Sequence, residues 1–118
     1  MCMTSKIYAR EILCKITGDT RIIVATKRRK NADFMKKYGL MTKDVGFYIR
    51  SLKEKNFVEK KKNTNEKIKA DYMYVFYKKF FLADEYGDNL EQVYIKICIL
   101  DNLENTIYVE SFHDEYNF

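Results

Sequence analysis

The side chains of this sequence that could carry out chemistry are mainly lysine and tyrosine, together with one histidine. The motifs of NTPases, α/β-hydrolases and two-histidine acid–base enzymes are missing from it. Lysine, tyrosine and histidine suffice for one reaction, the metal-independent cleavage of RNA. In that reaction the substrate's own 2′-hydroxyl is the nucleophile, and the protein supplies a base, an acid for the leaving 5′-oxygen and cations for the phosphorane.

Three side chains near the carboxyl terminus are candidates for this chemistry. Tyr94 and Lys96 are two residues apart in an alternating segment, so a strand would place them on one face. Tyr94 could exchange a proton or be a core aromatic, and Lys96 could bind phosphate or be an exposed lysine that discourages edge pairing. His113, with an ordinary pKa of about 6.5, could exchange a proton near neutrality, or it could be an idle surface histidine beside two acids.

Charge is divided unevenly along the chain. Residues 1–80 hold 21 of the 22 Lys and Arg side chains and eight acids, a net charge of +13, whereas residues 81–118 hold nine acids and only Lys96, a net charge of −8. Lys and Arg near phosphates release condensed counterions, so the basic segment predicts a polyanion partner, nucleic acid first. The alternative is a solvated lysine-rich surface.

Length and composition set the class of protein. A chain of 118 residues predicts a single domain spanning 1–118, and 47% hydrophobic residues exclude wholesale disorder. No apolar stretch approaches the roughly 20 residues that span a bilayer, and no helical segment has a clearly basic amphipathic face, so we expect no membrane partner. The amino terminus lacks an apolar run of signal-peptide length, which predicts a cytoplasmic protein.

The cysteines suggest no cofactor. Cys2, Cys14 and Cys98 are an odd number without metal-type spacing, so we expect no zinc site, no disulfide scaffold and no other cofactor. Cys14 and Cys98 have apolar neighbours and are expected to be small buried hydrophobic residues.

The first half of the chain predicts helices. Apolar residues at helical spacing follow Thr4 or Ser5 as N-cap, and Gly18 is placed where a C-cap would be. A short helix is expected from Asn31 to Gly39, and a third begins at Thr42. Its apolar stripe consists of Val45, Ile49 and Leu52.

The rest of the chain predicts strands. A β-branched run at 21–26 predicts a short strand before four adjacent basic residues, 27–30. Residues 59–70 predict a mobile lysine-rich loop or frayed hairpin arm. Segments 72–81, 93–100 and 106–112 predict three antiparallel strands, joined by a loop at 83–90 and a short hairpin connection. The predicted fold is α+β, with N-terminal helices packed on one face of an antiparallel sheet.

The carboxyl-terminal half resembles a known family. The runs Gln92-Val93-Tyr94-Ile95-Lys96-Ile97 and Ile107-Tyr108-Val109-Glu110-Ser111-Phe112 resemble the last hairpin of the MqsR-type (motility quorum-sensing regulator) toxins, and the resemblance extends upstream through Asn31-Ala32-Asp33, Leu52 and Phe57. It implies a RelE-like fold, the activity of an mRNA interferase and inhibition by a cognate antitoxin.

The resemblance also implies site residues. Tyr94 matches the family's catalytic tyrosine, and Lys60 falls within a residue or two of its functional lysine. The family's glutamine falls near Tyr74, and His113 follows Ser-Phe where the family has a lysine. We therefore expect Tyr94, His113 and Lys60 to be catalytic. The substrate phosphates would be bound by Lys61, Lys62, Lys96 and Tyr74.

Two readings of function follow. The first is a type II toxin that cleaves single-stranded mRNA without metal, and it requires the terminal hairpin and the lysine-rich segment to converge on one pocket. The second is a non-catalytic protein of phage or plasmid origin that binds nucleic acid or a host factor. A homodimer joined through the basic loop and the acidic tail at 114–115 is a further possibility.

Overall fold

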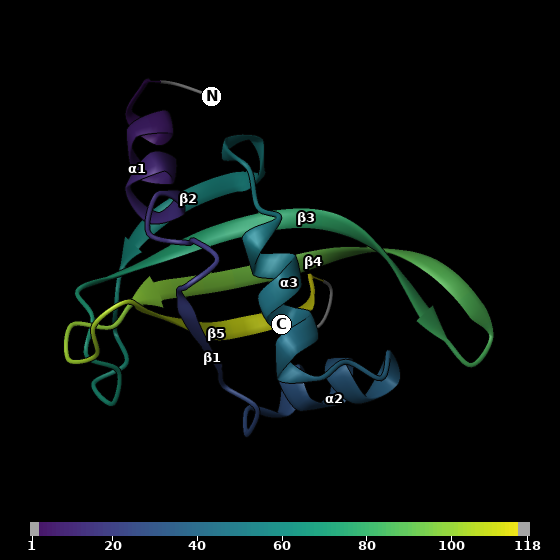
Figure 1. Ribbon diagram of the computed structural model, residues 1–118. Helices are drawn as coiled ribbons and strands as arrows, with labels where there is room; N and C mark the ends of the chain where they lie inside the picture. The colour runs from purple at the N-terminus through teal and green to yellow at the C-terminus, as the bar shows by residue number, and fades with distance from the viewer. Residues whose placement is uncertain (1–2, 116–118) are drawn as a thin grey trace.

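The computed structural model describes residues 3–115, which contain three helices and five strands (Figure 1). The elements are α1 (Met3–Leu13), β1 (Arg21–Val24), α2 (Arg29–Lys37), α3 (Thr42–Arg50), the 3₁₀ turn η1 (Glu54–Asn56), β2 (Phe57–Lys62), β3 (Tyr72–Asp84), β4 (Gly87–Ile99) and β5 (Thr106–Asp114).

The strands form one mixed sheet in the order β1-β5-β4-β3-β2. The antiparallel meander β3-β4-β5 is confirmed, but the sheet is larger than predicted because β1 and β2 add to its two edges. β1 pairs with β5 in parallel, from Arg21 opposite Thr106 to Val24 opposite Val109. This pairing places the segment that follows β1 beside the last strand.

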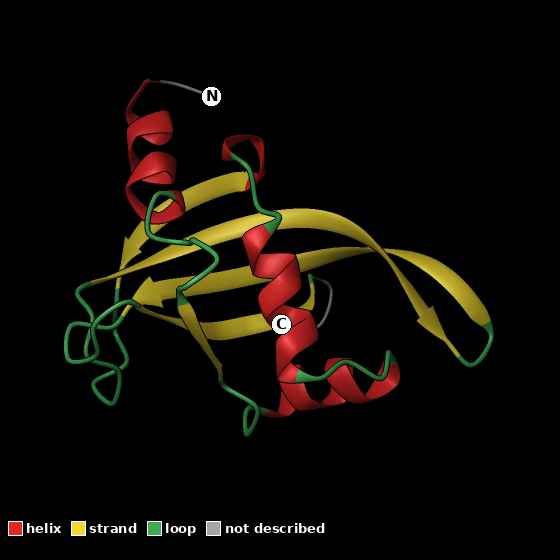
Figure 2. Ribbon diagram, in the orientation of Figure 1, coloured by secondary structure: helices red, strands yellow, loops and turns green. Residues whose placement is uncertain are grey.

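The helices cover one face of the sheet, as expected (Figure 2). The predicted stripe of α3 is confirmed, since Val45 and Ile49 are fully buried and Leu52 nearly so. We call the face under α1 and α3 the helix face, and the opposite one the open face. No helix among residues 3–115 is long and apolar enough to cross a bilayer.

Helix boundaries follow local hydrogen bonding. α1 ends at Leu13 rather than near Gly18, because residues 17–20 form their own turn, in which the Thr20 hydroxyl oxygen accepts the Thr17 N–H at 2.8 Å. Thr4 and Ser5 lie inside α1, so the predicted N-cap is wrong. Gly39 ends α2 with φ +61°, a conformation that favours glycine, and that prediction is confirmed.

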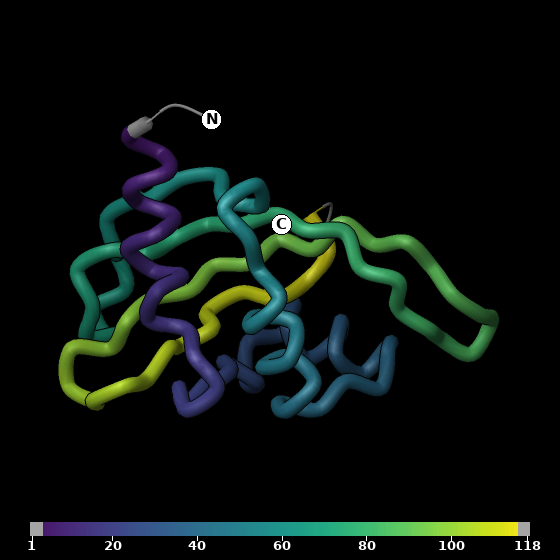
Figure 3. The backbone as a smooth tube through the Cα atoms, turned by 45° about the horizontal axis from the view of Figure 1, so that its top comes forward, coloured from purple at the N-terminus to yellow at the C-terminus, as the bar shows by residue number. Residues whose placement is uncertain are grey.

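The predicted loop at 83–90 is a hairpin instead. β3 and β4 remain paired to Asp84 and Gly87, where Gly87 has φ +125° and the Tyr86 N–H donates to Asp84 Oδ1 at 2.8 Å. The result is a long arm that extends beyond the other strands (Figure 3).

The lysine-rich segment is also more regular than predicted. Residues 57–62 form β2, and the connection to β3 spans residues 63–71. The Asn63 side-chain amide donates to the carbonyls of Asn65, Ile68 and Ala70 at 3.1, 3.0 and 2.8 Å. The connection is therefore a hydrogen-bonded loop, not a frayed arm.

Candidate functional site

A cleft of about 380 Å³ opens on the open face, where β4 and β5 meet the start of α2. We call it the basic cleft. Its lining consists of Arg28, Arg29, Lys30, Tyr94, Lys96, Ser111 and His113. Four of these seven side chains are basic, so the cleft presents positive charge around one tyrosine and one histidine.

Strand register brings the tyrosine and the histidine together. Val93 and Ile95 are fully buried in the core on the helix face, so alternation turns Tyr94 to the open face. Tyr94 is directly opposite His113 in the β4–β5 ladder, and their rings stack with centroids 5.5 Å apart and planes 29° apart. The two predicted acid–base residues therefore lie side by side.

A β-bulge in β5 keeps His113 on that face. Lys96 pairs with Ser111 and Ile97 with Val109, which leaves Glu110 as the extra residue. Val109 and Phe112 are both fully buried although they are three residues apart, and strict alternation would have turned His113 into the core.

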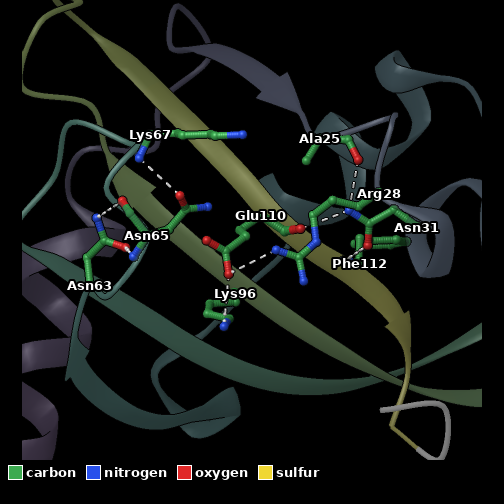
Figure 4. A network of polar contacts seen from close by, with 9 residues as sticks. All are labelled: Ala25, Arg28, Asn31, Asn63, Asn65, Lys67, Lys96, Glu110 and Phe112. Atoms are coloured by element: carbon green, nitrogen blue, oxygen red, sulfur yellow. Dashed lines mark hydrogen bonds and ion pairs between the residues drawn. The ribbon is translucent and has the colours of Figure 1, made fainter.

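Asn31 holds the bulge in place (Figure 4). Its side-chain amide donates to the carbonyls of Ala25 and Glu110 at 3.0 and 2.8 Å, and its Oδ1 accepts the Phe112 N–H at 2.9 Å. Asn31 is fully buried. Beyond the end of β1, the Asn31 side chain therefore takes the place of a strand at the edge of β5. It also holds the basic residues at 27–30 close to the strand that carries His113.

Glu110 positions two of the cations. Its carboxylate, whose side chain is 6% exposed, lies 2.9 Å from Lys96 Nζ and 3.4 Å from Arg28 Nη1 (Figure 4). A buried carboxylate of this kind requires paired cations. Glu110 thereby fixes one lysine and one arginine at the wall of the basic cleft.

Burial sets the protonation of the two central residues. It lowers the pKa of His113 below its ordinary value and raises that of Tyr94 above it. His113 Nδ1 lies 2.8 Å from the Asp114 carbonyl, to which it can only donate, so in the neutral ring Nε2 carries the lone pair. Near neutral pH the cleft therefore contains a neutral imidazole base beside a protonated phenol.

Lys60 and Tyr74 lie elsewhere, and the expectation that they share a pocket with Tyr94 is wrong. They pair with each other on the helix face, below α1. Lys60 Nζ is 2.6 Å from Glu11 Oε1, the Tyr74 hydroxyl donates to the same carboxylate oxygen, and the ammonium also lies over the ring of Tyr72. We call these four residues the Lys60 cluster, and it fastens α1 to the sheet.

The neighbouring lysines divide between the two faces. Lys62 is opposite Tyr72 and shares the helix face with Lys60. Lys61 is opposite Met73, so it is on the open face, but its row of the sheet is not that of Tyr94 and it does not line the basic cleft. The predicted convergence of the terminal hairpin with the lysine-rich segment is therefore wrong. Tyr94, Lys96 and His113 share one cleft, whereas Lys60, Lys61, Lys62 and Tyr74 do not line it.

Several residues of the site were not identified from sequence. The basic run at 27–30 was visible as charge, yet only the parallel β1–β5 pairing places it beside the terminal hairpin. The sequence drew attention to Asn31, Glu110 and Ser111 only because they belong to the segments that resemble the MqsR-type family.

The cysteines differ from the prediction in part. Cys98 is buried, as expected, and burial raises the pKa of its thiol to about 12. Cys14 is exposed, contrary to expectation, and Cys2 is outside the described residues.

The fold and the basic cleft define a small α+β protein with a cationic, acid–base-capable site on its sheet. Comparison with models of known protein families, with curated proteins and with solved structures finds no match. The MqsR-type resemblance therefore stays a prediction.

Proposed function

We propose that this protein is a metal-independent endoribonuclease, an mRNA interferase, that cleaves single-stranded RNA in the basic cleft. The observation that carries the proposal is the direct pairing of Tyr94 with His113 in a cleft whose lining also contains four basic side chains. Transesterification of RNA requires a base, an acid and cations, and the histidine, the tyrosine and the basic side chains can fill these three roles.

In the proposed reaction the 2′-oxygen attacks the adjacent phosphorus and the bond from phosphorus to the 5′-oxygen breaks. His113 Nε2 takes the proton of the 2′-hydroxyl, and the Tyr94 phenol gives its proton to the leaving 5′-oxygen. Lys96 and Arg28, positioned by Glu110, stabilise the negative charge of the phosphorane. The products are a 2′,3′-cyclic phosphate and a free 5′-hydroxyl, and solvent returns the proton from imidazolium to phenolate.

The resemblance to MqsR-type toxins supports a wider proposal about biology. The protein would be the toxin of a type II toxin–antitoxin system, acting on mRNA in the cytoplasm, and its antitoxin would cover the basic cleft. Convergence with the lysine-rich segment is not needed in this form of the proposal, because Lys96 and Arg28 supply the cations. Lys60 belongs to the Lys60 cluster and is given no part in the reaction, because its ammonium is paired with Glu11 on the helix face.

The test is cleavage of end-labelled single-stranded RNA by the purified chain in EDTA. We expect products with 2′,3′-cyclic phosphate ends, and a loss in kcat of at least about tenfold for Tyr94→Phe and for His113→Gln, because general acid–base groups contribute about 10²–10⁴-fold. Tyr86→Phe is the matched control, since Tyr86 is 89% exposed at the hairpin tip. Intact RNA, or full rates in both cleft variants, would refute the proposal.

One observation favours a second function, binding without cleavage. His113 is only 3% exposed, which limits the approach of a substrate to its ring. In that case the basic cleft would bind RNA or DNA as a polyanion, and affinity would fall steeply with salt yet be unaffected by Tyr94→Phe and His113→Gln.

A further inference from the structure

A second cleft adjoins the basic cleft on the open face, and Arg28 lines both. We call it the loop cleft, and its volume is about 370 Å³. It lies between the 63–71 connection, the β4–β5 connection and the strands β1 and β5. Arg28 therefore lies at the boundary that the two clefts share.

The inner lining of the loop cleft is apolar and aromatic. Ile23, Ile68 and Leu100 are half-buried there, Leu103 is exposed, and the half-buried Tyr108 contributes a ring. Flat nucleobases bind to proteins by stacking on aromatic rings and packing against aliphatic groups. The lining thus offers a surface for a base rather than for a phosphate.

The rim of the loop cleft is polar, with two amides, Asn65 and Asn102, and two cations, Lys67 and Lys69. Amide side chains both donate and accept hydrogen bonds, and so can discriminate base edges. The two lysines provide positive charge for the flanking phosphates. Apolar lining, amide rim and cations together match the parts of one nucleotide.

The walls of this cleft are already formed. Asn63 ties the connection through three carbonyls, and Asn65 Oδ1 accepts the Lys67 N–H at 3.0 Å (Figure 4). The Asp101 N–H donates to the Lys69 carbonyl at 2.8 Å, which links the two connections that flank the cleft. A preformed pocket binds without the entropic cost of ordering a loop.

We propose that the loop cleft binds the nucleobase next to the scissile phosphate of single-stranded RNA and thereby sets the sequence preference of cleavage. This inference rests on the proposed function. Asn102 and Asn65 would read the base edge, Tyr108 would contact the base plane, and Arg28 would bind the phosphate shared by the two clefts.

The first experiment is cleavage of a randomised single-stranded RNA pool, with every cut site sequenced. Wild type should show a base preference at one position beside the cut, and Asn102→Ala should reduce that preference at least about fivefold. Asn89→Ala, an amide deletion on the hairpin arm, is the matched control and should leave the preference unchanged. An unchanged preference in both Asn102→Ala and Asn65→Ala would overturn the inference.

A binding experiment separates this inference from the proposed function. Labelled 2′-O-methyl octamers of the repeated dinucleotide UX, with X as A, C, G or U, cannot be cleaved through the 2′-oxygen, so their affinities report recognition alone. If wild type cuts no RNA but discriminates between the octamers, and Asn102→Ala abolishes that discrimination, the loop cleft is supported as a base-reading site and the nuclease proposal is refuted. Equal affinity of wild type for all four octamers would overturn the loop cleft as a base-reading site, whatever the outcome of the cleavage assay.

Discussion

Replacement of Asn31 by alanine should destabilise the fold more than any other single amide deletion discussed above. The alanine leaves two backbone groups without a partner, the carbonyl of Glu110 and the N–H of Phe112, and it removes one of the two donors from the carbonyl of Ala25, which still accepts the Arg28 N–H at 3.2 Å. All three face a side chain that is fully buried, so water cannot replace the lost amide without opening the structure.

The size of the effect follows from the two groups that lose their partner. A buried polar group that loses its partner costs about 1–3 kcal/mol. Even at the lower end, two such groups reduce the free energy of unfolding by about 2 kcal/mol, out of the roughly 5–15 kcal/mol that is usual for a small domain. At about 4 °C per kcal/mol, the melting temperature should fall by about 8 °C or more.

Urea unfolding followed by circular dichroism measures this loss directly. Asn89→Ala is the control, because within residues 3–115 its side chain makes one hydrogen bond, a long local one of 3.5 Å to the Gly87 carbonyl. It should change the free energy of unfolding by less than about 0.5 kcal/mol. Asn31→Asp keeps the acceptor for Phe112 but puts a carboxylate against two carbonyls, so it should cost at least as much as alanine. A loss below about 1 kcal/mol for Asn31→Ala would show that Asn31 does not hold the bulge.

Three further predictions concern the cleft and the Lys60 cluster. Because burial lowers the pKa of His113, the unfolded chain binds that proton first as the pH falls; the free energy of unfolding should therefore decline from about pH 6.5 downward, less so in His113→Gln, and the acid limb of kcat/KM should lie below pH 6.5. Lys96→Gln should weaken binding of uncleavable single-stranded RNA and make the slope of log affinity against log salt less steep by about 0.7, as filter binding at four salt concentrations would show; an unchanged slope would exclude Lys96 as a phosphate contact. Glu11→Gln should lower the free energy of unfolding by about 1 kcal/mol at low salt and leave the RNA cleavage rate unchanged. A large fall in the cleavage rate with unaltered stability would indicate that Lys60 takes part in catalysis.

Part of the site could be predicted because alternation is local information. Val93 and Ile95 define a buried face by their side chains alone, so Tyr94 and Lys96 had to share the other face, and the structure confirms it. No such pattern exists in residues 59–62, where three lysines follow a glutamate. Without apolar alternation the sequence does not specify which side chains of a strand lie on which face of the sheet. The position of Lys60 under α1 could therefore not be predicted.

The remaining parts depend on contacts between distant segments. Arg28 reaches the cleft because β1 pairs with β5, and no local pattern indicates a parallel partner. His113 stays on the open face because of one extra residue, Glu110, whose bulge is recognisable only once Val109 and Phe112 are known to share the core. The alternation of apolar residues predicted the strand. It could not predict the bulge, after which the side chains of that strand exchange faces.

The parallel pairing of β1 with β5 has a consequence for synthesis of the chain. The Asn31 amide must wait for a carbonyl 79 residues further along, which at about 5–20 residues per second takes roughly 4–16 s of translation. Until then the ribosome carries the basic run without the histidine that completes the cleft. If the chain cuts messages, no unfinished copy can damage the transcript from which it is still being read.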